Sequence, residues 1–123
     1  MTEQEHGTQA RQEQGIQIEQ SRKRVRVYLS GDLVADTTRP FLVWEWPYYP
    51  VYYIPAEDVR AQLIPAGQAA GPADLGDAEL MHVSTLTAVA EGAGRRYPGS
   101  PVPQLRDLVR LEFSAMTEWF EED

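Results

Sequence analysis

The chain contains no cysteine and only two histidines. The lack of cysteine excludes disulfide bonds and thiolate zinc sites, and two imidazoles leave little material for a histidine-based metal centre. The phosphate-binding and dinucleotide-binding glycine motifs are also missing. We therefore expect a protein that works without a metal or another cofactor.

Basic residues are scarce, with 11 Lys and Arg against 19 Asp and Glu and a net charge of -8. A protein that binds the phosphate backbone needs a dense basic face to displace counterions. Nucleic acid is therefore not an expected partner.

Long apolar runs are absent as well. No stretch approaches the roughly twenty residues needed to cross a bilayer, and the first residues lack the apolar region of a signal peptide. We expect no membrane partner and a cytoplasmic location. A chain of 123 residues with 42% hydrophobic content has the size of one domain with a single core.

The N-terminal segment, residues 1–22, is predicted to be a flexible polar tail or lid, followed by a single β-rich domain over residues 23–123. Gln and Glu dominate this segment, and Ile16 and Ile18 are its only sizeable apolar residues after the first methionine. Such a segment buries too little surface to offset its ordering entropy. Alternatively, Ile16 and Ile18 are spaced as on one face of a strand and add an edge strand to the domain.

Apolar and polar residues alternate with period two over residues 25–29. Residues 41–46 are also expected to form a strand, with Phe41, Val43 and Glu45 on one face and Leu42, Trp44 and Trp46 on the other. Each stretch is predicted to form a hairpin with the segment that follows it. The first turn is Ser30-Gly31-Asp32, and the second reversal lies between Pro47 and Pro50. The returning strands are residues 33–35 and 51–54, and one helical turn is expected after Pro55.

The second half of the chain is punctuated by glycine and proline. Residues 65–77 and 91–103 are predicted to be loops, because they show no periodicity. Residues 60–64, before the first loop, and residues 79–89, between the two loops, are expected to be extended. The last segment, from Leu105 to Phe120, fits both a helical and a strand period, and periodicity alone leaves both readings open.

Aromatic residues concentrate between Phe41 and Val59, which holds seven of the twelve in the chain. Such side chains give large contact area with few rotors to order. Glu45 stands between Trp44 and Trp46, so in a desolvated pocket it is a candidate general acid or base. The alternative is that its face of the strand points to water.

The candidate site therefore joins one catalytic residue, Glu45, to a set of ligand-binding residues. For Asp58, a structural role in the turn after Pro55 is the alternative, and for His82 it is a place at the rim of the core. The ligand-binding candidates are Trp44, Trp46, Tyr48, Tyr49, Tyr53, Asp58 and His82.

Three sequence blocks carry a family resemblance: VRVYLSGDLVADTTRP, YYIPAEDVR and SAMTEWFEED. In this order they resemble the domain of unknown function 427 family, some of whose members carry a nucleotidyltransferase label. The resemblance implies a mainly β domain of two antiparallel sheets, β-tent or barrel-like, with one or two short helices. It favours a strand over residues 108–113 and a short helix over residues 114–120, with Ser114 as its N-cap.

The chain also departs from the family pattern. Members usually carry a Cys-Pro-Tyr-Lys-Gly motif, and residues 71–76 read Gly-Pro-Ala-Asp-Leu-Gly here instead. The usual Glu-Thr-Gly hairpin is replaced by Glu-Trp-Pro-Tyr-Tyr over residues 45–49, so polar residues give way to aromatic ones. Nucleotidyl transfer needs closely spaced metal-binding carboxylates and a glycine-rich phosphate cradle, and neither is visible. That activity is therefore not expected.

Two functional hypotheses follow. The first is a small-molecule-binding domain, acting as a cofactor-independent cyclase or isomerase on an apolar substrate in an aromatic-lined pocket. The second is a non-catalytic interaction module whose Trp46, Tyr48 and Tyr49 form an aromatic patch for a protein partner. Both a monomer and a homodimer are compatible with the sequence.

Overall fold

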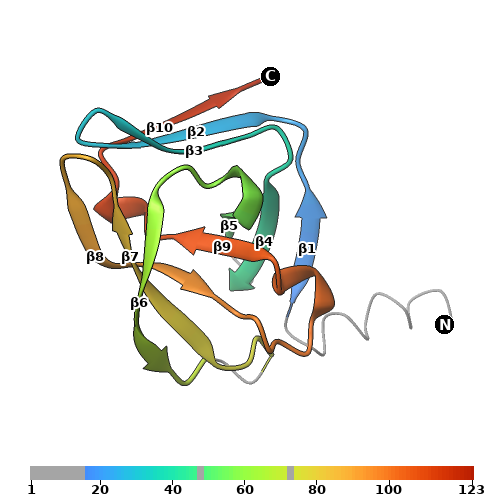
Figure 1. The fold of residues 1–123 in the computed structure, drawn as a ribbon. Coiled ribbons are helices and arrows are strands. Elements are labelled where there is room, and N and C mark those ends of the chain that lie inside the picture. Colours follow the sequence, from blue (N-terminus) through green and yellow to red (C-terminus); the bar gives the residue numbers. More distant parts are fainter. Residues whose placement is uncertain (1–15, 47–48, 72–73) are drawn as a thin grey trace, which may run out of the picture.

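The computed structural model describes residues 16–46, 49–71 and 74–123, with the side chains of residues 45, 46 and 49 outside the description. Ten strands form two antiparallel sheets. The larger has the order β1-β4-β5-β9-β8-β7-β6, and the smaller has the order β10-β2-β3. Figure 1 shows the three-stranded sheet lying across one end of the larger one. The expected mainly β fold of two antiparallel sheets is confirmed.

The strands are short, and the helical content of the described residues consists of three single 3-10 turns. The strands are β1 (Gln17–Gln20), β2 (Arg24–Leu29), β3 (Asp32–Thr37), β4 (Phe41–Trp46), β5 (Tyr49–Pro55), β6 (Gln62–Ala69), β7 (Ala78–Ser84), β8 (Val89–Arg96), β9 (Leu108–Leu111) and β10 (Glu118–Glu122). The turns are η1 (Ala56–Asp58), η2 (Pro103–Leu105) and η3 (Phe113–Ala115).

The β2–β3 hairpin confirms the first period-two prediction. Val25, Val27 and Leu29 are buried on one face of β2. Ser30 and Gly31 have φ angles of 51° and 87°, as the two central positions of a type I′ turn require. This turn matches the twist of the strands, so local sequence is sufficient to form the hairpin.

Strand β1 is the edge strand that the spacing of Ile16 and Ile18 allows. It pairs antiparallel with β4, from Gln17 opposite Trp44 to Gln20 opposite Phe41. Ile16 is buried in the core just before the strand begins. Residues 1–15 of the predicted tail lie outside the described residues.

The β4–β5 hairpin and the turn after it are also observed. Phe41 pairs with Tyr53, and a register shift falls between Val43 and Trp46 before the reversal. The expected helical turn is η1, which follows Pro55 directly. Residues 62–64 of the stretch expected to be extended belong to β6.

Two loop predictions are wrong. Strand β6 continues through Pro65 to Ala69. It is an edge strand, and there a proline without an N–H group is tolerated because the sheet loses no hydrogen bond that it needs. Gly67, with φ of 119°, lies at a register shift against β7. Similarly, residues 89–96 form β8, in which Gly94 lets the backbone approach the Met81 and Val83 side chains.

The predicted strand over residues 79–89 is too long. Strand β7 ends at Ser84, and residues 85–88 form the turn that leads into β8. The Thr85 hydroxyl accepts hydrogen bonds from the backbone N–H groups of Thr87 and Ala88, at 3.4 and 3.1 Å. A threonine side chain thus stops the strand by supplying a local partner for the backbone.

The C-terminal helix implied for residues 114–120 is wrong. Strand β9 is observed, ending at Leu111, but it is followed by η3 and then by β10. Ser114 lies inside η3 and is not its N-cap. Strand β10 pairs with β2 from Glu118 opposite Tyr28 to Glu122 opposite Arg24. Pairing with this distant strand overrides the helical spacing of the local apolar residues.

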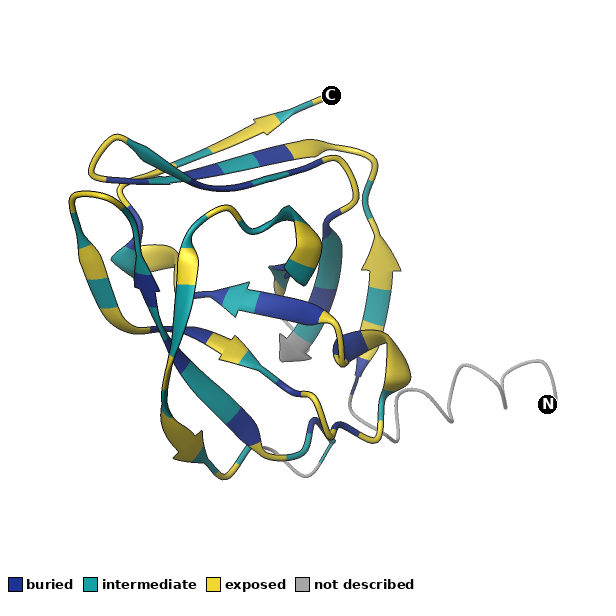
Figure 2. Ribbon diagram, in the orientation of Figure 1, coloured by how far each residue is buried: buried dark blue, intermediate teal, exposed yellow. Residues whose placement is uncertain are grey.

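The buried residues form two clusters on opposite faces of the large sheet. Tyr53 and Ile54 are neighbours in β5 and belong to different clusters, because successive strand residues point to opposite faces. The first cluster joins Val25, Val27 and Val34 of the small sheet to Val83 and Val109 of the large one. Figure 2 shows buried stretches on the strands of both sheets. This shared core holds the two sheets together.

Candidate functional site

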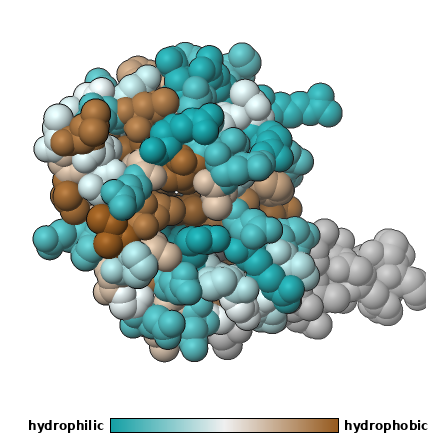
Figure 3. Space-filling view, viewed as in Figure 1, coloured by the Kyte–Doolittle hydropathy of each residue, from teal (hydrophilic) through white to brown (hydrophobic). Residues whose placement is uncertain are grey.

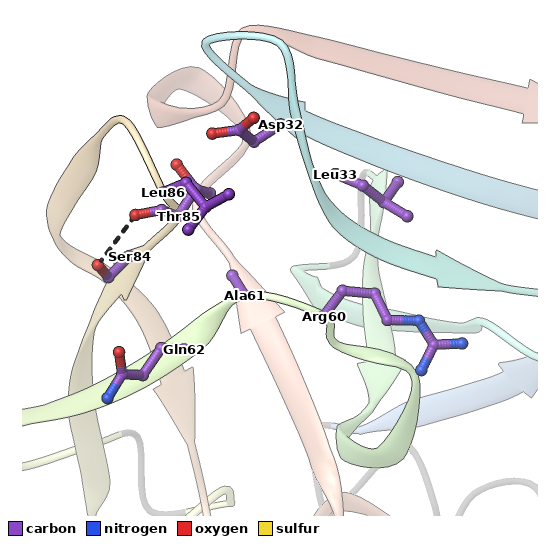
Figure 4. A pocket seen from close by; sticks show the side chains of 8 residues that line it. All are labelled: Asp32, Leu33, Arg60, Ala61, Gln62, Ser84, Thr85 and Leu86. Carbon is purple, nitrogen blue, oxygen red and sulfur yellow. Dashed lines mark hydrogen bonds between the residues drawn. The ribbon is translucent and has the colours of Figure 1, made fainter.

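A pocket of about 420 Å³ opens at the junction of the two sheets. Three segments form it: the start of β3, the link from η1 into β6, and the end of β7 with its turn (Figure 4). The residues that line it are Asp32, Leu33, Arg60, Ala61, Gln62, Ser84, Thr85 and Leu86.

The β3 side of the pocket is positioned by the β2–β3 turn. Thr117 holds this turn, because its hydroxyl accepts a hydrogen bond from the Ser30 N–H at 2.8 Å and donates one to the Tyr28 carbonyl at 2.9 Å. Asp32 follows the turn directly, so the turn fixes the position of the Asp32 backbone at the edge of the pocket.

The link into β6 is held against β3 by the backbone. The N–H groups of Arg60 and Ala61 both donate to the Val34 carbonyl, at 2.6 and 3.1 Å. Val59 forms a bridge with Ala35 next to them. A link between two strands of the large sheet is therefore held against the small sheet at this point, and Ala61 packs against the shared core.

The β7–β8 turn closes the third side. The Thr87 hydroxyl donates a hydrogen bond of 2.8 Å to Oδ2 of Asp32. Hydrogen bonds from Thr87, and next from Thr85, lower the pKa of the Asp32 carboxyl below its usual 3.8. Asp32 is therefore a carboxylate at neutral pH.

Arg60 brings a positive charge to the same pocket. Its side chain is exposed, and Nη1 lies 3.5 Å from the Glu57 carbonyl oxygen. Within the described part of the chain, neither Asp32 nor Arg60 belongs to an ion pair. The pocket thus presents one carboxylate and one guanidinium without a partner of opposite charge.

Apolar and polar residues share the lining of the pocket. Leu33, Ala61 and Leu86 are the apolar ones, and Leu86 is 98% exposed. Figure 4 shows Leu86 directed into the space between Asp32 and Ala61. Figure 3 shows a hollow on this face of the molecule with apolar surface beside it. A ligand that covered Leu86 would remove apolar surface from water.

The residues predicted for the aromatic site lie mostly on the β4–β5 hairpin. Trp44 is half-buried. The backbones of Trp46 and Tyr49 pair with each other. The side chains of these two residues and of Glu45, as well as the whole of Tyr48, lie outside the described residues.

The other three predicted residues lie apart from the hairpin tip. Tyr53 is fully buried in the second core cluster, and its ring stacks on Tyr97 with centroids 6.4 Å apart. Asp58 accepts a hydrogen bond of 2.7 Å from the Thr37 hydroxyl. Nδ1 of His82 accepts one of 3.0 Å from the Gly92 N–H.

No predicted site residue with a described side chain lines the pocket. The sequence predicts Asp32 in a turn and Thr85 in a strand, and no local spacing relates the two residues. One signal for the pocket is present in the sequence. Leu86 stands between Thr85 and Thr87, and threonines around an apolar residue are typical of a side-chain-stabilised turn.

Other kinds of site are not found in the described ranges. These contain no cluster of three or more His, Asp or Glu side chains able to hold a metal ion. No helix in the described part of the chain is long and apolar enough to cross a membrane.

The segment that replaces the family motif is closely packed. A Cβ atom at Gly71 would lie 2.0 Å from the Gly76 carbonyl oxygen and 3.4 Å from the Tyr97 ring. Leu75 is buried in the second core cluster together with Tyr97. On the described residues, this segment supports the core.

Comparison with known proteins gives one family. The family model described as a domain of unknown function, DUF427, matches residues 17–122. Comparison with curated proteins finds no match. The matched residues include all ten strands and the pocket, and the chain therefore belongs to the DUF427 family.

Proposed function

We propose that the domain binds a small organic molecule in the pocket between its two sheets. The observation that carries this proposal is a cavity of about 420 Å³ whose lining combines apolar side chains with polar and charged groups. Ligand sites typically measure about 300–1,000 Å³ and combine these two kinds of lining.

The proposal is supported by how firmly the walls are held. The Val34 carbonyl fixes the link into β6, and Thr87 fixes the β7–β8 turn to Asp32. A pocket whose walls are already connected loses little conformational entropy when a ligand enters.

This function is tested by measuring ligand binding to the parent protein and to a variant whose pocket is filled. The amide spectrum of the labelled protein is recorded by NMR while a fragment library is added, and binders are expected to shift the signals of Asp32, Gln62 and Thr85. Ala61→Phe should abolish these shifts because the ring occupies the cavity. Ala70→Phe, at an exposed position outside the lining, is the matched control. A library that leaves all pocket signals in place would refute the function.

Catalysis is a separate part of the proposal and concerns the β4–β5 hairpin. Its support is the sequence alone, where a carboxyl group stands between two indoles at Trp44 and Trp46. As a cofactor-independent cyclase or isomerase, the domain would use Glu45 as general acid or base on an apolar substrate. Glu45→Gln would then end turnover while ligand binding persists.

An interaction module is the second candidate, and exposed apolar residues favour it. Phe113 is 68% exposed and Val89 is 56% exposed. Phe113 stacks on Trp119 with ring centroids 5.1 Å apart, so the exposed ring is held in one orientation. Under this candidate, a partner bound by the immobilised domain is released by Phe113→Ser and by Val89→Ser. Gln104→Ser, at an exposed polar position, leaves it bound.

A further inference from the structure

The two charges in the pocket keep bonding positions for a ligand. A carboxylate has about four acceptor positions, and those of Asp32 are used in part by Thr87 and, next, by Thr85. A guanidinium has five N–H donors, and Arg60 makes one long contact with a backbone carbonyl. Both groups can therefore bind a ligand without giving up an ion pair.

Neighbouring charges are paired, which sets these two apart. Arg24 binds Asp36 through two hydrogen bonds of 2.9 and 2.8 Å. Arg39 pairs with Glu57 in the turn before Arg60. The nearby acids already have cationic hydrogen-bond partners, so Arg60 keeps N–H donors for a ligand at this end of the pocket, although its charge also contributes to lowering the pKa of Asp36.

The two charges lie at different ends. Figure 4 shows the Arg60 side chain extending away from Ala61 and Leu86, so its guanidinium lies well apart from the Asp32 carboxylate. The apolar side chains of Leu33, Ala61 and Leu86 line the space that the charges border. A complementary ligand has an apolar body and carries opposite charges at separated positions.

Single-charge ligands fit less well. An anion would gain Arg60 but would face Asp32 in a chain of net charge -8. A cation would gain Asp32 and leave Arg60 unpaired, and a neutral ligand would desolvate both charges without pairing either one. A ligand with both charges avoids each of these costs.

We infer that the pocket takes a small zwitterion with an apolar body, whose ammonium group binds Asp32 and whose carboxylate binds Arg60. A hydrophobic dipeptide is the simplest molecule of this class. This inference rests on the proposed small-molecule function and names the ligand class for the same pocket.

Three matched probes test the inference: L-leucyl-L-leucine, its N-acetyl derivative and its C-terminal amide. The first carries both charges, and each of the others lacks one. Amide signals of Asp32, Ala61 and Thr85 report binding during NMR titration of the full chain. The dipeptide should bind about tenfold more tightly than either blocked form, as expected for the loss of one charged contact.

Variants that each remove one charge of the pocket show which residue binds which end of the dipeptide. Asp32→Asn should lower the affinity for the dipeptide and leave the affinity for the N-acetyl form unchanged. Arg60→Gln should lower the affinity for the dipeptide and leave the affinity for the amide unchanged. Asp77→Asn and Arg95→Gln remove exposed charges outside the pocket lining and serve as controls.

The outcomes separate the two proposals. Equal affinities for all three probes, or fragment binding without dipeptide binding, would overturn the zwitterion and leave the small-molecule function intact. If neither the dipeptide nor any fragment moves the pocket signals, the small-molecule function itself fails.

Discussion

The Thr87 hydroxyl and the Asp32 carboxylate are joined by a hydrogen bond of 2.8 Å that connects the two sheets. Thr87 lies in the β7–β8 turn of the large sheet, and Asp32 begins β3 in the small sheet. The bond crosses one side of the pocket, so this pair of side chains helps to set the pocket width.

This pair should make stability sensitive to acid. The pKa of Asp32 is lowered by the hydrogen bond from Thr87, so its stabilisation is complete above the unfolded pKa near 3.8 and is lost as pH falls through the lower folded value. Thr87→Val should flatten this dependence. Unfolding in urea, followed by tryptophan fluorescence at neutral and at acid pH, measures it, with Ser114→Ala as control. Parallel pH curves for Thr87→Val and the parent would contradict the prediction.

Gly71 is expected to tolerate no side chain. In Gly71→Ala the new Cβ would lie 2.0 Å from the Gly76 carbonyl oxygen, so the backbone of the segment must move. We expect a loss of at least about 1–3 kcal/mol in the free energy of unfolding, as for overpacked cores. Gly99→Ala meets nothing within 4 Å and should change stability by less than about 0.5 kcal/mol. Equal effects of the two changes would refute this account.

Thr37 is expected to stabilise η1 through its hydroxyl. The residue is 1% exposed, donates to Asp58 at 2.7 Å and accepts from the Arg39 N–H at 3.0 Å. Thr37→Val keeps the shape and removes both bonds, which should cost about 1–3 kcal/mol in denaturant unfolding. Thr38→Val, at the exposed neighbouring position, is the control and should be nearly neutral.

Tyr52 should make the protein sensitive to alkali. Burial, and next a hydrogen bond to Glu121, raise the pKa of the Tyr52 phenol from 10.0 to about 12. The folded state holds this proton more tightly, so the stabilisation is complete below pH 10 and is lost as the pH rises toward about 12. Tyr52→Phe should remove this loss. Phenolate absorbance and unfolding midpoints across the range would show it, and an ionisation at the ordinary pH would rule it out.

Much of the fold follows from local sequence. The β2–β3 hairpin could be predicted because its apolar residues alternate and Ser30-Gly31 suits a type I′ turn. The β4–β5 hairpin and the turn η1 after Pro55 have equally local causes. These elements are determined by residues within a few positions of one another.

Errors arose where the partner of a segment is distant. Strand β8 contains glycines and looked like a loop, yet β7 and β9 supply its hydrogen bonds. Strand β10 had helical spacing, yet it completes the small sheet beside β2. Propensity is a weak guide when sheet pairing with a remote strand decides the conformation.

By itself, the sequence determined the β class, the first hairpins and the absence of cysteine-based chemistry. Only the tertiary structure decided that Asp32, Arg60 and Leu86 share one pocket. These residues belong to three segments far apart in the chain, and no local spacing relates them. They meet because the two sheets pack on one core. Hydrogen bonds to the Val34 carbonyl and from the Thr87 hydroxyl also join segments of the large sheet to β3 of the small one.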